Sequence, residues 1–198
     1  MHPALNRNAY LIKEHIGMFK ATSAYDVFDP ATGEQIIECR EERVGFVNQF
    51  IRVFNRELAN NMPFHVDVRA SDGEQLLSID RGFAMFRSKV KVYNEADEHV
   101  GGFHQKMLSL RGTFVVVDVN DQPLCTLQGK LLRRQYTFAR DGVELARVSQ
   151  KFSGLGKELF TTADNYVLEI FDNVPPDNPI RTLILAAVLC IDKVRKEG

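Results

Sequence analysis

The alternation of apolar and polar residues along the chain predicts a series of β-hairpins. In each, a run with apolar residues at every second position leads into a polar turn, after which the alternation resumes. A period of two is that of a strand with one buried face. The turns contain residues that favour chain reversal, such as Asp72-Gly73 and Asp141-Gly142. We therefore predict five hairpins, over residues 25–38, 64–79, 89–103, 113–127 and 136–148.

Two segments depart from this alternation and have helical spacing. Apolar positions in residues 43–60 recur at intervals of three and four, which predicts an amphipathic helix that ends before Pro63. A last strand is expected over Tyr166–Phe171, and a second helix is expected from Ile180 to about Val194. Residues 183–191 of that helix are apolar on every face, so we expect protein to surround it.

Together these elements favour a mainly β fold, a closed antiparallel barrel of about twelve strands around a buried C-terminal helix. Consecutive hairpins of that number would otherwise leave two long open edges. A barrel of this size has a bore too wide for its own side chains to fill, and the apolar helix would fill it. Its apolar run is less than half of the about 20 residues that a membrane span needs. No linker divides the chain, so we expect a single domain over residues 1–198.

Composition excludes several classes of protein. With 44% hydrophobic residues and a net charge of −1, the chain is neither disordered nor suited to bulk nucleic-acid binding. The first twenty residues lack the pattern of a secretory signal. Cys39, Cys125 and Cys190 are far apart and form no C-x-x-C motif, so we expect a reducing compartment, the cytoplasm, and buried, unreactive thiols.

Residue patterns typical of catalysis are missing from the sequence. It contains no G-x-S-x-G, no H-E-x-x-H and no complete phosphate-binding loop, so we expect no enzymatic activity and no cofactor. His99 and His104 are the histidines close enough for a metal pair. Five residues apart on one strand, they are expected to point to opposite faces, and no metal site is predicted.

Charge is unevenly distributed. Residues 81–157 contain 13 Lys plus Arg and 7 Asp plus Glu, a balance of +6, and the rest of the chain has a balance of −7. Strand alternation directs several of these cations outward, where they would attract an anionic surface such as lipid headgroups. The alternative is an ordinary solvated barrel wall. The candidate lipid-binding residues are Lys89, Lys91, Lys130, Arg133, Arg134, Arg147 and Lys151.

Four segments carry a resemblance to a known family. Residues 63–82, 87–106, 141–171 and 181–192 resemble the phospholipid scramblase and LURP-one-related group of the tubby-like superfamily. The resemblance covers about residues 62–192 strongly and 10–40 more weakly. It implies a twelve-stranded barrel around a hydrophobic helix, in agreement with the pattern above. It also implies an association with membrane lipids.

The resemblance does not extend to the residues credited with calcium binding in scramblases. That acidic segment opens Asp-Ala-Asp-Asn-Phe, whereas this chain has Thr162-Ala163-Asp164-Asn165-Tyr166. Asn173 stands where a closing acid would lie. Because Ca²⁺ takes six to eight oxygen ligands, several of them carboxylate, we expect no calcium site here.

Several functions remain open at this stage. The first is a non-enzymatic barrel that binds anionic phospholipid headgroups, or another anionic partner, at the inner face of the plasma membrane. The second is a scramblase that moves lipids between leaflets, which would require the C-terminal helix to leave the barrel. The third is a small-ligand carrier with an open bore, or a scaffold for protein interactions.

Overall fold

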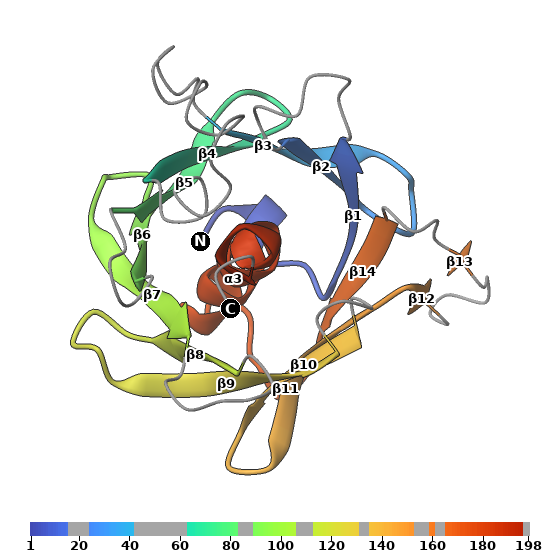
Figure 1. Ribbon diagram of the computed structural model, residues 1–198. Helices are drawn as coiled ribbons and strands as arrows, with labels where there is room; N and C mark the ends of the chain where they lie inside the picture. Colours follow the sequence, from blue (N-terminus) through green and yellow to red (C-terminus); the bar gives the residue numbers. More distant parts are fainter. Residues whose placement is uncertain are drawn as a thin grey trace, which may run out of the picture.

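Twelve strands form a closed antiparallel barrel (Figure 1). The computed structural model describes residues 1–15, 24–41, 63–82, 89–105, 113–130, 135–152, 159–160 and 165–195. Around the barrel the strand order is β1-β14-β11-β10-β9-β8-β7-β6-β5-β4-β3-β2. The barrel strands are β1 (Ala9–His15), β2 (Ala24–Phe28), β3 (Gln35–Glu41), β4 (Phe64–Ala70), β5 (Gln75–Arg81), β6 (Lys89–Asn94), β7 (His99–Gln105), β8 (Phe114–Val117), β9 (Pro123–Lys130), β10 (Gln135–Arg140), β11 (Val143–Ser149) and β14 (Asn165–Ile170).

All five predicted hairpins are confirmed, as the pairs β2–β3, β4–β5, β6–β7, β8–β9 and β10–β11. Their turns adopt the left-handed backbone that the turn residues favour, with φ of +75° at Gly33 and +93° at Gly73. Asp97 and Asp121 occupy the corresponding positions of two other turns, with φ of 59° and 60°. Aspartate tolerates this conformation better than most residues.

Strand β1 was not predicted, although it closes the barrel between β2 and β14. Its inward residues, Tyr10 and Ile12, are fully buried, but Leu11 between them is also apolar and obscures the alternation. The short pair β12 (Lys151–Phe152) and β13 (Leu159–Phe160) was not predicted either, and it forms a separate two-stranded sheet. The amphipathic helix expected over residues 43–60 lies outside the described residues.

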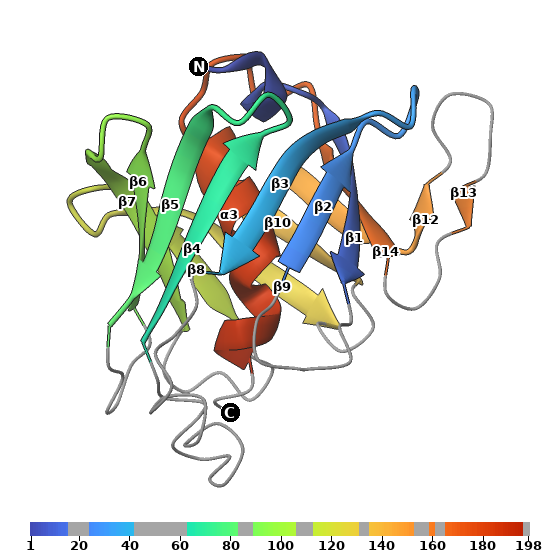
Figure 2. The same cartoon turned by 90° about the horizontal axis from the view of Figure 1, so that it is seen from above.

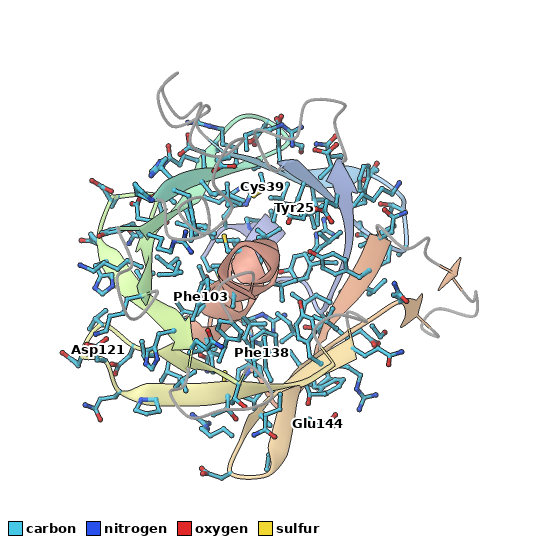
Figure 3. All side chains as sticks on the ribbon, in the orientation of Figure 1. Tyr25, Cys39, Phe103, Asp121, Phe138 and Glu144 are labelled. Carbon is cyan, nitrogen blue, oxygen red and sulfur yellow. The ribbon has the colours of Figure 1, made fainter. Side chains whose placement is uncertain are left out.

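The predicted C-terminal helix is confirmed as α3 (Ile180–Arg195), which runs through the bore of the barrel (Figures 1 and 2). Every residue from Leu183 to Cys190 is at most 1% exposed. Inward side chains of the strands, including Phe103 and Phe138, surround it (Figure 3). Among the described residues, no helix has both the length and the apolar character that crossing a membrane requires.

A buried arginine anchors the start of α3. Arg181 is 1% exposed, and its Nη1 donates to the carbonyl oxygen of Val174 at 2.7 Å. Its Nη2 donates to the carbonyl oxygen of Arg7 at 2.7 Å and to Oδ1 of Asn8 at 2.6 Å. One guanidinium therefore joins three segments, namely the N-terminal residues, the connection after β14 and the helix itself.

The five hairpin turns lie at one end of the barrel, where α3 also begins (Figure 2). Residues 29–34, 71–74, 95–98, 118–122 and 141–142 contain ten Asp and Glu and no Lys or Arg. Several of these acids hold their own turns, as when Oδ1 of Asp118 accepts from the backbone N–H of Asn120 and of Gln122. This end of the barrel, the turn end, therefore carries negative charge.

Candidate functional site

A pocket of about 490 Å³ opens on the outer wall of the barrel. It lies over β6, β7 and the end of β8, and the β8–β9 turn (residues 118–122) forms one side. Lys89 and Lys91 of β6 line it, together with His99 and His104 of β7 and Asp121 of the turn. Four side chains that are or can become cations thus surround one hollow.

Strand register explains how these groups come together. Lys89 pairs with His104 across the β6–β7 ladder, and Lys91 pairs with Gly102. Residues paired in this way share one face of the sheet. Gly102 also pairs with Val117 of β8, and Lys91, Gly102 and Val117 all line the pocket.

Both histidines line the same pocket, which corrects the expectation that they point to opposite faces. The cause is a β-bulge in the β6–β7 ladder. Val92 pairs with Gly101 and Tyr93 pairs with His99, so Val100 is an extra residue in β7. One extra residue resets the alternation, and side chains an odd number of positions apart then lie on the same side.

One carboxylate already interacts with these cations. Nζ of Lys89 lies 2.7 Å from Oδ2 of Asp121, and both side chains are more than half exposed. This hydrogen bond and the charge of Lys89 lower the pKa of Asp121, with smaller contributions from His104 and His99. Asp121 is therefore ionised at neutral pH, and Figure 3 shows its position at the outside of the barrel.

The other predicted basic residues do not join this pocket in the part of the chain that the structure describes. Arg147 lies on β11, and four strands separate β11 from β6. Its Nη2 is 2.5 Å from Oε2 of Glu144, and its guanidinium lies 5.5 Å from the centre of the Phe171 ring. Lys130 ends β9 and Lys151 begins β12, but their side chains lie outside the description, as do residues Arg133 and Arg134.

A second pocket, of about 310 Å³, lies at the turn end of the barrel beside the start of α3. Its lining is mostly apolar, with Leu124, Leu145 and Leu183 among the contributors. Arg140 and Asp118 are its charged residues. It therefore suits an apolar group better than a charged one.

Residues that could hold a metal are found at one place among the described residues. His2, Asp72 and Glu74 bring their ligand atoms within 4.8 Å of one another. However, Nδ1 of His2 accepts a hydrogen bond from the backbone N–H of Ala4 at 3.1 Å. A neutral imidazole then carries its proton on Nε2, the nitrogen that faces Glu74, and this proton opposes metal binding there.

The segment that resembles the scramblase calcium region provides few free carboxylates where it is described. Oδ1 of Asp172 accepts a hydrogen bond from Nδ2 of Asn8 at 3.0 Å. Asn173 donates through Nδ2 to the carbonyl oxygen of Glu144 at 2.8 Å. Residues 161–164, with Asp164, lie outside the described part of the chain.

The three cysteines are buried and not joined in disulfides, as the sequence predicts. Burial raises the pKa of the Cys125 thiol from 9.0 to about 12, so its thiolate is scarce at neutral pH. We expect a thiol-specific disulfide reagent at pH 8 to leave the folded protein unmodified and to titrate three thiols per chain in denaturant. Rapid modification of any thiol in the folded protein would contradict this expectation.

Comparison with known protein families gives a match over most of the chain. Residues 12–196 match the sequence model of the family described as Scramblase. No curated protein and no solved structure matches the chain. The family assigned by this match agrees with the resemblance seen in the sequence.

Proposed function

Because the chain belongs to the Scramblase family, we propose that this barrel binds the headgroups of anionic phospholipids at a membrane surface. Family membership and the barrel fold support a scramblase-like, lipid-binding role, and the scramblases are not a family of enzymes. The proposal goes further than family membership in two respects: the headgroup is anionic, and one particular surface of the barrel contacts it.

The observation that carries the proposal is a pair of lysines, Lys89 and Lys91, at the pocket of about 490 Å³ on the outer wall of the barrel. We call this pocket the wall pocket. Lys89 and Lys91 are exposed, adjacent on one strand face and next to a hollow large enough for a small polar group. Each basic residue near an anionic bilayer contributes about 1 kcal/mol of attraction. The acidic turn end would be repelled by the same bilayer, so the barrel would bind with its hairpin turns away from the membrane.

The bore of the barrel argues against the carrier alternative. In the described part of the chain, α3 occupies the space that a small ligand would need, and residues Leu183–Cys190 are buried by the surrounding strands. Arg181 adds three hydrogen bonds that keep the helix in place. Enclosure of α3 fits a binding role better than insertion of this helix into lipid.

Co-sedimentation with vesicles tests the proposal. We expect the protein to bind vesicles that contain phosphatidylserine in addition to phosphatidylcholine, and not to bind vesicles of phosphatidylcholine alone. Binding should weaken as the salt concentration rises, because salt screens the charges. The double substitution K89E/K91E should weaken binding about 30-fold or more, since at least about 2 kcal/mol of attraction is lost.

A matched control separates a specific surface from net charge. The substitutions K13E/R147E change the charge equally but lie on β1 and β11, on another side of the barrel. They should weaken binding far less than K89E/K91E. Equal losses would show that no particular face is used, and an absence of binding to any vesicle would disprove the proposed function.

A further inference from the structure

One of the side chains that line the wall pocket is negatively charged, namely the carboxylate of Asp121. Asp121 reaches Lys89 from a turn that is far away in sequence, and the ion pair crosses from the β8–β9 turn to β6. His99 and His104 add their attraction to the same carboxylate. Asp121 therefore shares the pocket with two lysines of β6 and two histidines of β7.

The turn itself does not need this carboxylate. Its backbone is held by Asp118, whose Oδ1 accepts from the N–H groups of Asn120 and Gln122 at 2.8 and 2.9 Å. The backbone N–H of Asp121 donates to the carbonyl oxygen of Asp118 at 3.1 Å. At φ of 60° asparagine fits as well as aspartate, so local structure does not explain a charged residue at position 121.

The pocket can hold a larger and more highly charged group than this carboxylate. Its volume of about 490 Å³ lies in the range typical of small-ligand sites. Lys91 lines it beside Lys89, and its ammonium makes no ion pair in the described part of the chain. A phosphate monoester has close to two negative charges near neutral pH and three acceptor oxygens, which match two lysines and two histidines.

We propose that the pocket between β6, β7 and the β8–β9 turn binds a phosphate monoester. When the phosphate is absent, the carboxylate of Asp121 pairs with the ammonium of Lys89, so that Asp121 competes with the phosphate for this lysine. The inference rests on the proposed function and narrows it, because it names the headgroup chemistry. Phosphatidic acid presents a phosphate monoester at a bilayer surface, whereas the phosphate of phosphatidylserine is a diester. Inorganic phosphate presents similar chemistry in solution.

Asp121→Asn tests the competitor role, with Asp97→Asn as its matched control. Both aspartates are exposed and occupy left-handed positions in hairpin turns, but Asp97 lies outside the pocket lining. We expect D121N to bind inorganic phosphate, and vesicles of phosphatidylcholine with phosphatidic acid, about two- to fivefold more tightly than wild type. The gain is modest because an exposed ion pair contributes little. D97N should bind like wild type, and equal effects of the two variants would overturn the competitor role.

The choice of vesicle separates this inference from the proposed function. Tighter binding to phosphatidic acid than to phosphatidylserine at equal surface charge supports a monoester site. Equal binding to both, with dependence on Lys89 and Lys91 retained, overturns the monoester site and leaves the proposed function intact. Binding of inorganic phosphate that depends on these lysines, without binding to any vesicle, supports the pocket and disproves the lipid role.

The histidines provide an independent readout. His99 and His104 line the same pocket as the two lysines, and an imidazole ring N–H can donate to a phosphate oxygen. We expect the double variant H99Q/H104Q to bind inorganic phosphate about three- to fivefold more weakly than wild type at one fixed pH. An unchanged affinity would show that the histidines take no part.

Discussion

The Gly102→Ala variant should be less stable than wild type by about 3 kcal/mol or more, or should fail to fold. A Cβ atom at position 102 would lie 2.0 Å from the carbonyl oxygen of Val90, well inside van der Waals contact. That oxygen belongs to the backbone of the neighbouring strand β6, so no side-chain rotation can relieve the clash. Overpacking costs about 1–3 kcal/mol even where side chains can adjust.

Thermal unfolding followed by circular dichroism measures this effect. A chain of this length loses about 2–4 °C of Tm for each kcal/mol, so we expect Tm to fall by about 6–12 °C. Gly82→Ala is the control, because a Cβ there meets no atom within 4 Å and its backbone is not left-handed. That variant should keep or slightly raise Tm. Equal losses in both variants would contradict the steric explanation.

The Arg181→Met variant should lose about 2–4 kcal/mol of stability. Methionine retains much of the buried apolar volume, but the carbonyl oxygens of Val174 and Arg7 and the Oδ1 of Asn8 lose their donors. A buried acceptor without a partner costs about 1–3 kcal/mol, and the sum is reduced because a charge no longer has to be buried. Tyr10 lies in the same region, where burial raises its pKa to about 12.

Denaturant unfolding and hydrogen exchange together test the role of Arg181. The midpoint of unfolding should fall for R181M, and backbone amides of residues 1–8 and 174–183 should exchange faster than those of the barrel strands. Arg140→Met removes an exposed arginine near the same end of the barrel and should change stability by less than about 0.5 kcal/mol. An R181M protein as stable as wild type would show that the three hydrogen bonds do not anchor the helix.

Local patterns were sufficient where the structure depends on neighbouring residues. The hairpins follow from alternation and from turn residues a few positions away, which is why all five were predictable. The apolar residues on every face of α3 required surrounding protein, and a barrel built from consecutive hairpins has a bore wide enough for such a helix. Strand β1 was missed because its exposed side carries an apolar residue, Leu11, and because its partner β14 is more than 150 residues away in sequence.

The candidate site was only partly predictable. Alternation correctly placed Lys89 and Lys91 on the outside of β6, but it put His99 and His104 on opposite faces. Nothing in the sequence marks Val100 as the extra residue of a bulge, since the bulge is defined by pairing with β6. Asp121 was recognised as a turn residue and not as the partner of Lys89, because that contact depends on how the β8–β9 turn folds against the wall.

Residue types and their local spacing are sufficient to predict the strands of the five hairpins, the enclosed helix and the excess of positive charge over residues 81–157. Which of these charges become neighbours depends on how the strands are paired around the barrel. Four strands separate Lys91 from Arg147, whereas Asp121 and Lys89, 32 residues apart in the chain, form an ion pair. The register of a closed barrel follows from all of its strands together, so which outward side chains are neighbours cannot be read from any one of them.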